Sequence, residues 1–153
     1  MCLKLYESFG DKFAVYGLGW GNMPFKANSI SESECSQTYS QYKIAINHSH
    51  FLRTGYSSNR LFYILASGTF CLSQHYPKME DEFEDGKHLV SFSGIDNLVD
   101  KCYFWLKAEN ESERNKIAEQ GCNYVHQNCT WSKRIEQLKP IILKHYPYLY
   151  DKK

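Results

Sequence analysis

The chain has 153 residues with a formal net charge of +1, and charged residues make up 23 % of it. This length is typical of one domain, and it suffices to bury a core without help from disulfides or a metal. The near balance of charge argues against a general nucleic-acid-binding protein, in which a basic excess gathers on one face.

Two further classes are disfavoured by the composition. No stretch is apolar over the length of a transmembrane helix, and residues 1–10 contain Lys4 and Glu7 where a signal peptide would be apolar. The six cysteines form no CxxC pair, and several lie inside apolar runs. We therefore expect a cytoplasmic protein with reduced cysteines and no structural metal.

Four short apolar runs predict the strands, at residues 13–16, 44–46, 70–72 and 89–92. The runs are continuous rather than alternating, as expected for strands buried on both faces. Helical patterns lie between and after them, and this order is typical of an α/β domain with a parallel sheet and crossover helices. Residues 20–29 are rich in Gly, Asn and Pro and predict a loop after the first strand.

The first two predicted helices have clear start signals. Ser31 followed by Glu34 forms a capping-box pattern for a helix that runs through about Lys43. Ser57 or Ser58 then caps a helix that continues to residue 66 and stops at Gly68.

Three more helices follow the fourth apolar run. Residues 95–106 place their apolar members on one face, and a capping pattern at Asn110 opens the next helix. Thr130 caps the last helix, which Pro140 should kink or shorten. The apolar stripe of this last helix is Trp131, Ile135, Leu138 and Ile142. We expect one domain over residues 1–145 and a frayed tail over 146–153.

Ligands of an open parallel sheet bind beyond the carboxyl ends of its strands, so the segments after the apolar runs are candidate sites. The glycine-rich residues 17–21 do not form a dinucleotide fingerprint, because no helix follows directly and the third glycine is missing. His48 and His50 share a strand face, but two ligands do not complete a metal site. The sequence assigns no catalytic residue.

Residues 55–60 offer a phosphate site. They precede a predicted helix, so backbone N–H groups converge near Ser58 and Asn59, and Arg60 adds a fixed positive charge. The alternative is a plain helix cap beside a surface arginine, and the local sequence does not decide between the two.

Several segments, in this order, resemble one family. They are FAVYGLGWGN, YKIAIN, GYSSNRLFYILASGTFCLS, EDEFEDGKHLVSFSGIDNLVDKCYFWL and ERNKIAEQGCNYVHQNCTWSKRIEQL. The chain resembles the C-terminal, nucleotide-sugar-binding domain of glycosyltransferases of the GT-B fold, in the group of spore-maturation-type and phage-encoded enzymes. The resemblance implies a Rossmann-like sheet and transfer of a sugar from a nucleotide-diphosphate donor, with no other cofactor.

The resemblance also implies a binding site. The turn Ser58, Asn59 and Arg60 would lie against the diphosphate or ribose, and the residues from Asn47 to His50 would line the cleft. Gly19 and Trp20 would face the donor or another domain. Relatives often carry Glu at the position of Tyr63, where the carboxylate binds the ribose hydroxyls. The phenol of Tyr63 can form one hydrogen bond there, but it is not a bidentate acceptor.

The family's N-terminal domain is not matched by any segment, and residues 1–10 resemble a helix that follows the first strand of the donor domain. We therefore expect a fragment of a larger transferase, or a chain that needs a partner domain, a partner chain or a homo-oligomer, and we expect no transferase activity from this chain alone. The alternative function is a non-catalytic nucleotide-binding or oligomeric interaction module derived from such an enzyme. The base, the sugar, the acceptor and the stereochemistry stay open.

Overall fold

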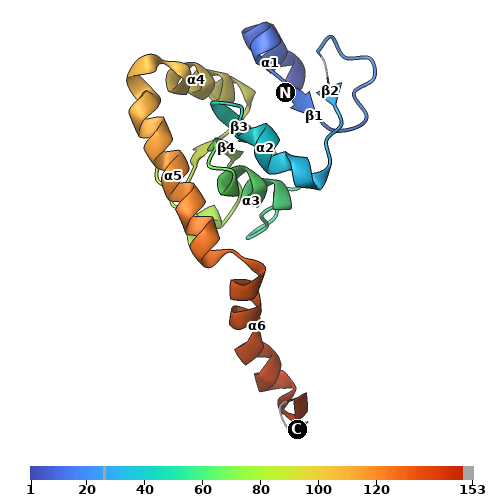
Figure 1. Cartoon of the computed structure of the whole chain (residues 1–153), viewed down its shortest axis with the longest axis vertical. Coiled ribbons are helices and arrows are strands. Elements are labelled where there is room, and N and C mark those ends of the chain that lie inside the picture. Colours follow the sequence, from blue (N-terminus) through green and yellow to red (C-terminus); the bar gives the residue numbers. More distant parts are fainter. Residues whose placement is uncertain (26, 150–153) are drawn as a thin grey trace.

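The computed structural model describes residues 1–25 and 27–149 (Figure 1). Its regular elements, in chain order, are α1 (Cys2–Phe9), β1 (Val15–Tyr16), β2 (Ala27–Asn28), α2 (Cys35–Tyr39), β3 (Ile44–Asn47), α3 (Asn59–Ala66), β4 (Phe70–Gln74), β5 (Val90–Phe92), α4 (Ile95–Leu106), α5 (Glu111–Asn128) and α6 (Trp131–His145). Short 3₁₀ turns connect several of them, among them Glu32–Glu34 and Met79–Asp81.

The main sheet has the order β3-β4-β5, and both of its strand pairs are parallel. Each strand coincides with one of the continuous apolar runs. Helix α3 connects β3 with β4, whereas the connection from β4 to β5 holds only the 3₁₀ turn Met79–Asp81. Helices flank the sheet, so the expected α/β architecture with a parallel sheet is confirmed. Because the strands are parallel, their carboxyl ends meet at one edge, where Asn47 lies beside Ser73 and Gln74 beside Phe92.

Strand β4 is buried on both faces, which is why its sequence is continuously apolar. Phe70 and Leu72 point to one side, into a cluster shared with α1, α4 and α5, whereas Cys71 points to the other, toward α3. Burial of each large side chain of this kind stabilises the fold by about 1.5–3 kcal/mol. The central strand therefore holds the two helical layers together.

One buried charge fixes the junction of α4 and α5. Arg114 is 2 % exposed. Its Nη1 donates to the carbonyl oxygen of Trp105 over 2.6 Å, and its Nη2 pairs with Glu111 Oε1 at 2.8 Å. A buried guanidinium is tolerated because these bonds satisfy it.

A small second sheet was not expected. Residues 20–29 do not form a loop throughout, because β2 pairs in parallel with β1. A hydrogen bond of 2.6 Å between the hydroxyls of Tyr16 and Tyr42 ties this sheet to the segment before β3, and it raises the pKa of Tyr42 to about 12. The helix after Ser31 is also shorter than predicted, since α2 ends at Tyr39 and turns follow before β3.

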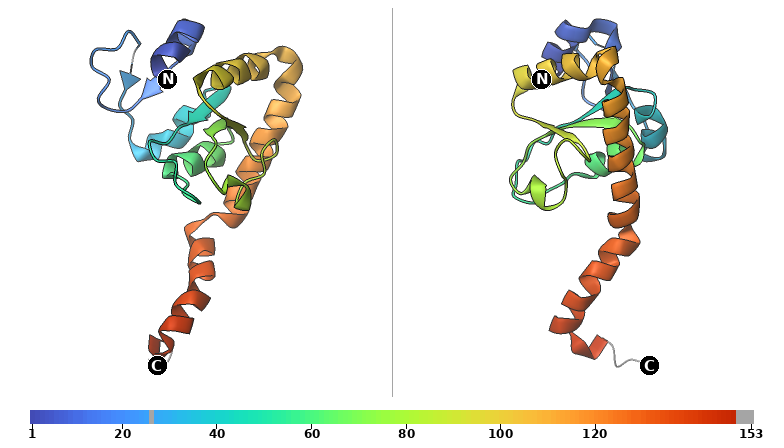
Figure 2. Two further views of the ribbon diagram at one scale, coloured as in Figure 1. Left: turned by 180° about the vertical axis from the view of Figure 1, so that it is seen from behind. Right: turned by 90° about the vertical axis from the view of Figure 1, so that its left-hand side faces the viewer.

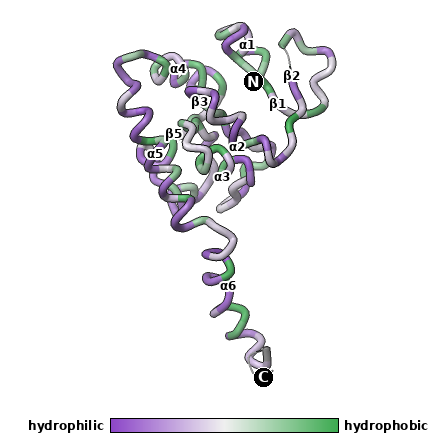
Figure 3. Tube along the Cα trace, in the orientation of Figure 1, coloured by the Kyte–Doolittle hydropathy of each residue, from purple (hydrophilic) through white to green (hydrophobic). Residues whose placement is uncertain are grey.

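Helix α6 projects away from the rest of the molecule (Figures 1 and 2). Thr130 caps it as predicted, accepting from the backbone nitrogen of Lys133 at 3.3 Å. The predicted shortening at Pro140 does not occur, because the helix continues to His145. Figure 3 shows hydrophobic residues recurring along this projecting segment.

The predicted tail begins with a 3₁₀ turn at Pro147–Leu149, and its residues 150–153 lie outside the described residues. Over the described parts of the chain, none of the helices combines the length and the hydropathy needed to cross a bilayer.

Candidate functional site

The carboxyl ends of β3 and β4 place polar side chains side by side. Asn47 is 3 % exposed, and its amide nitrogen donates to Ser73 Oγ over 3.0 Å. Its amide oxygen accepts a hydrogen bond of 3.2 Å from Ser58 Oγ. Asn47 therefore fastens the start of α3 to the edge of the sheet.

The start of α3 is open to a ligand. Ser58 occupies the cap position in an extended conformation, but its hydroxyl is used by Asn47 and does not cap the helix. The backbone N–H groups of Asn59 and Arg60 belong to the first turn, where a helix offers them no acceptor. Such N–H groups, together with the helix dipole, favour an anion.

Arg60 adds positive charge at the same place. Its Nη1 donates to the carbonyl oxygen of His48 over 2.9 Å, which orients the guanidinium. A guanidinium has five N–H donors, so further donors are left for a ligand. The rings of His48 and His50 meet edge to face, with centroids 5.9 Å apart. Burial, and next the neighbouring His50, lower the pKa of His48, so its ring is neutral at physiological pH.

Tyr63 lies one turn after Arg60 on the same face of α3. Its hydroxyl donates a hydrogen bond to the carboxylate of Glu32, from the 3₁₀ turn before α2. That bond raises the pKa of the Tyr63 hydroxyl. A carboxylate therefore reaches this face of the helix from a different segment, although position 63 itself carries a phenol.

Gly19 and Trp20 lie apart from this group. They belong to the turn that follows β1, on the small sheet, where the Trp20 ring packs on Phe25 with centroids 5.7 Å apart. Gly19 has a φ of 90°, which favours glycine. The structure thus brings Asn47, Ser58 and Arg60 together and leaves the Gly19–Trp20 turn elsewhere, so a donor contact from that turn stays a prediction.

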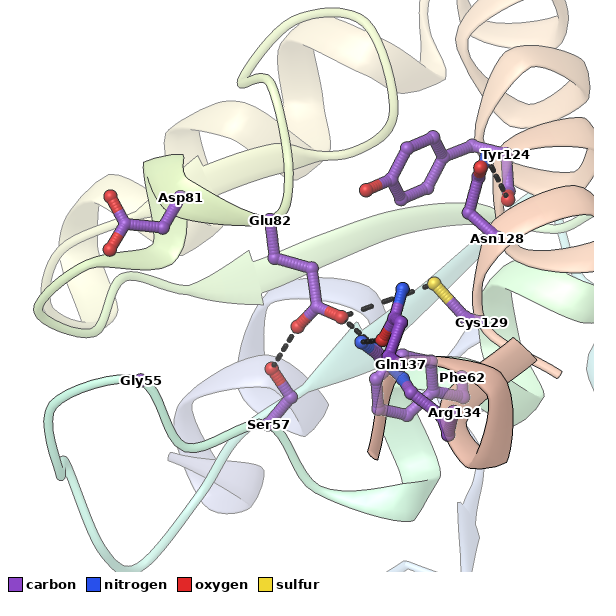
Figure 4. Close-up of a pocket in the computed structure, with 10 residues that line it drawn as sticks. All are labelled: Gly55, Ser57, Phe62, Asp81, Glu82, Tyr124, Asn128, Cys129, Arg134 and Gln137. Atoms are coloured by element: carbon purple, nitrogen blue, oxygen red, sulfur yellow. Dashed lines mark hydrogen bonds and ion pairs between the residues drawn. The ribbon is translucent and has the colours of Figure 1, made fainter. Parts of the chain in front are cut away.

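A cavity of about 550 Å³ adjoins the start of α3 (Figure 4). It is lined by polar side chains from three places, namely the loop before α3, the segment after β4, and the junction of α5 and α6. The lining includes Ser57, Asp81, Glu82, Tyr124, Cys129 and Arg134. Ser57 connects the cavity with the start of α3, since it directly precedes the cap residue Ser58.

The Glu82 carboxylate contacts two other residues that line this cavity. One carboxylate oxygen accepts from Ser57 Oγ at 3.3 Å, and the other forms an ion pair with Arg134. Ser57 Oγ also lies 2.6 Å from the Tyr76 hydroxyl. The guanidinium of Arg134 sits over the Phe62 ring, 5.9 Å from its centroid. The carboxylate is thus held between a hydroxyl and a cation.

Sequence reasoning did not find this cavity. Glu82 belongs to an acidic stretch that the sequence suggests is a short solvated helix, and Arg134 follows it by 52 residues. Gln74, at the end of β4, belongs to a candidate segment that follows an apolar run, and the structure adds a feature that the sequence does not show. Its side-chain oxygen is buried and, within the described residues, has no hydrogen-bond partner. A buried unpaired acceptor favours a ligand that donates a hydrogen bond.

Comparison with known proteins identifies a family for the chain. A search of curated proteins finds no match to the chain. A family model described as glycosyl transferase-like, however, matches residues 1–139, which include the sheet, the start of α3 and the cavity. The chain therefore belongs to the glycosyl transferase-like family.

Proposed function

We propose that this chain is the donor-binding half of a glycosyltransferase of the GT-B type, which transfers a sugar from a nucleotide-diphosphate sugar to an acceptor. One observation carries the proposal. The uncapped first turn of α3, held at the sheet edge by Asn47, presents backbone N–H groups beside the guanidinium of Arg60. A diphosphate is the part of such a donor that this combination binds best.

The two neighbouring features suit the rest of the donor. Carboxylates accept hydrogen bonds from sugar or ribose hydroxyls. Glu32 offers one beside Tyr63, and Asp81 and Glu82 offer others in the cavity next to Ser57. The same carboxylates repel phosphate, so we place the diphosphate at the start of α3 and the hydroxyl-bearing groups on either side. Positive charge at Arg60 and the helix dipole would stabilise the leaving diphosphate.

The acceptor and the catalytic base are assigned to a partner. We propose that a partner domain or chain contributes the acceptor-binding half. The turn at Gly19 and Trp20 is a candidate for facing that partner, since it lies away from the donor group.

Thermal unfolding against a panel of nucleoside diphosphates and nucleotide sugars tests donor binding. A ligand at 100 times its dissociation constant adds about 2.7 kcal/mol, a rise of roughly 5–10 °C in Tm for a chain of this size. A rise with one base supports a donor site and identifies the base. A folded sample that gives no rise with any member of the panel contradicts the proposal.

Arg60→Ala tests the placement of the diphosphate. Loss of a charged hydrogen bond costs about 1.5–3 kcal/mol, so we expect nucleoside diphosphate affinity to fall by about 10- to 150-fold. Arg53→Ala is the matched control, because Arg53 is an exposed arginine in the loop before α3. Calorimetric titration of both variants decides the point, and equal affinities in wild type and Arg60→Ala would refute the assignment.

The structure also offers one reason to keep a second candidate, a nucleotide-binding or interaction module without transferase activity. Tyr63 donates its hydroxyl to Glu32, so the phenol orients that carboxylate instead of binding a diol directly. The test is to add a fraction that contains the acceptor-binding partner to the chain with its bound nucleotide sugar. If the nucleotide binds but no sugar is released, this candidate is favoured.

A further inference from the structure

One face of α3 is faced by a carboxylate that does not belong to the helix. Tyr63 lies one turn after Arg60, and its hydroxyl donates a hydrogen bond to Oε1 of Glu32, which precedes it by 31 residues. Within residues 1–25 and 27–149, the second oxygen of this carboxylate, Oε2, has no hydrogen-bond partner. An ionised carboxylate offers about four acceptor positions, so most of those on Glu32 are open.

The segment that carries Glu32 is held in place by a second glutamate. The Glu34 carboxylate accepts hydrogen bonds from the backbone nitrogen of Ser31 at 2.8 Å and from the Ser31 hydroxyl at 2.7 Å, which fixes the 3₁₀ turn Glu32–Glu34. Helix α2 follows this turn and packs against α3. Glu34 is therefore used by the fold, whereas Glu32 is held beside α3 and is left for a ligand.

The carboxylate in the cavity on the other side of the anion site is engaged differently. One oxygen of Glu82 accepts from the Ser57 hydroxyl, and the other is paired with Arg134. Glu82 therefore has fewer open acceptor positions than Glu32. Two neighbouring hydroxyls, as in a ribose, donate best to a carboxylate whose oxygens are open, and this favours Glu32.

The spacing along α3 suits a nucleotide. Side chains one turn apart on a helix have Cβ atoms about 5–6 Å apart. In a nucleoside diphosphate the ribose follows the diphosphate directly. A diphosphate at the start of α3, beside Arg60, therefore brings its ribose to the Glu32 carboxylate that Tyr63 holds one turn along the helix.

We propose that Glu32 binds the 2′- and 3′-hydroxyls of the donor ribose, that Tyr63 is its positioning residue, and that the site thereby selects ribonucleotide donors over 2′-deoxyribonucleotide donors such as thymidine diphosphate sugars. The inference rests on the proposed function and adds to it the class of nucleotide and the direction of the donor. The ribose lies on the Glu32 side of the diphosphate, and the transferred sugar lies on the side of the cavity.

Calorimetric titration with matched pairs of nucleotides tests this inference. The probes are uridine, cytidine, guanosine and adenosine diphosphate, each compared with its 2′-deoxy analogue. The measured quantity is the ratio of the two dissociation constants, deoxy over ribo. Loss of the 2′-hydroxyl removes one hydrogen bond to a charged group, so we expect a ratio of at least about ten for the base that binds best. Base and diphosphate are the same within a pair, so the ratio reports on the ribose contact alone.

Two substitutions assign the effect to residues. Glu32→Ala should bring the ratio close to one, whereas the matched control Glu119→Ala, which removes the same charge at an exposed position of α5, should leave it unchanged. Tyr63→Phe should lower the ratio in part. The double variant should match Glu32→Ala alone, because a positioning residue has no effect once the group that it positions is gone. Thermal unfolding of each variant checks that it stays folded.

The possible failures are distinguishable. Equal affinities of the wild type for both members of the best-binding pair overturn this inference and leave the diphosphate site intact. A ratio that Glu32→Ala does not change also overturns it, because the ribose would then be bound elsewhere. Additive effects of the two substitutions would remove the positioning role of Tyr63. If no nucleotide of either kind binds to the folded chain, the proposed donor site itself fails, and the ribose site fails with it.

Discussion

Gly121 lies inside α5, where the helix crosses the segment before β5. A Cβ atom built at this position would lie 2.2 Å from the carbonyl oxygen of His88 and 3.0 Å from a methyl carbon of Leu65. The first distance is far below van der Waals contact, and the obstacle is backbone, which a rotamer change cannot move. Gly121→Ala therefore forces α5 and the His88 segment apart.

The magnitude follows from two opposing terms. Overpacking of a well-packed core costs about 1–3 kcal/mol, and a clash with backbone belongs to the upper part of that range. The alanine side chain favours the helix by about 1 kcal/mol relative to glycine. We expect Gly121→Ala to lower the free energy of unfolding by about 1–2 kcal/mol, which corresponds to a fall of roughly 2–8 °C in Tm.

Urea unfolding and thermal unfolding of the variant measure this effect. Asn123→Ala is the matched control, because Asn123 is an exposed residue of the same helix, and its replacement should stabilise by a few tenths of a kcal/mol. A Gly121→Ala protein as stable as Asn123→Ala would refute the reasoning, since it would mean that the His88 segment moves aside without cost.

Three further predictions concern titration, reactivity and the buried charge. Burial holds the pKa of His48 and His88 below the ordinary histidine value, so the unfolded chain takes up protons first and stability should fall as the pH drops through about 6.5. Urea midpoints that do not change between about pH 7.5 and about pH 5.5 would contradict this. Burial raises the pKa of Cys102 to about 11, so its thiol should resist Ellman's reagent at neutral pH until denaturant is added, as mass spectrometry of labelled peptides would show. Arg114→Ala should cost about 2–3 kcal/mol in urea unfolding, because a buried carbonyl loses its donor, and a loss below about 1 kcal/mol would show that water replaces the guanidinium.

Much of the fold could be predicted because the sheet is buried on both faces. Continuous apolar runs gave β3, β4 and β5 to within two residues, and the serine cap and Gly68 located α3. Elements without such signals were missed. Strand β2 has two residues, too few for a period to show, and its pairing with β1 depends on contacts outside its own sequence.

The candidate site, too, could be predicted from the sequence only in part. Strand-end reasoning found the segment that begins with Asn47, because parallel strands bring their carboxyl ends to one edge. The predicted start of a helix found Ser58 and Arg60. Neither signal could find Glu82 with Arg134, since that pair forms only when the start of α6 packs beside the segment after β4. The stripe of α6 shows a related limit: a period of 3.6 predicts that a helix has an apolar face but does not say whether anything covers it.

The ion pair between Glu82 and Arg134 has a consequence for communication within the chain. It joins the start of α6 to the wall of the cavity. The same carboxylate therefore holds the helix in place and is available to a ligand in the cavity. A ligand that took Glu82 from Arg134 would loosen the base of α6. By thermodynamic reciprocity, whatever holds α6 in one orientation would then change the affinity for that ligand by the same factor.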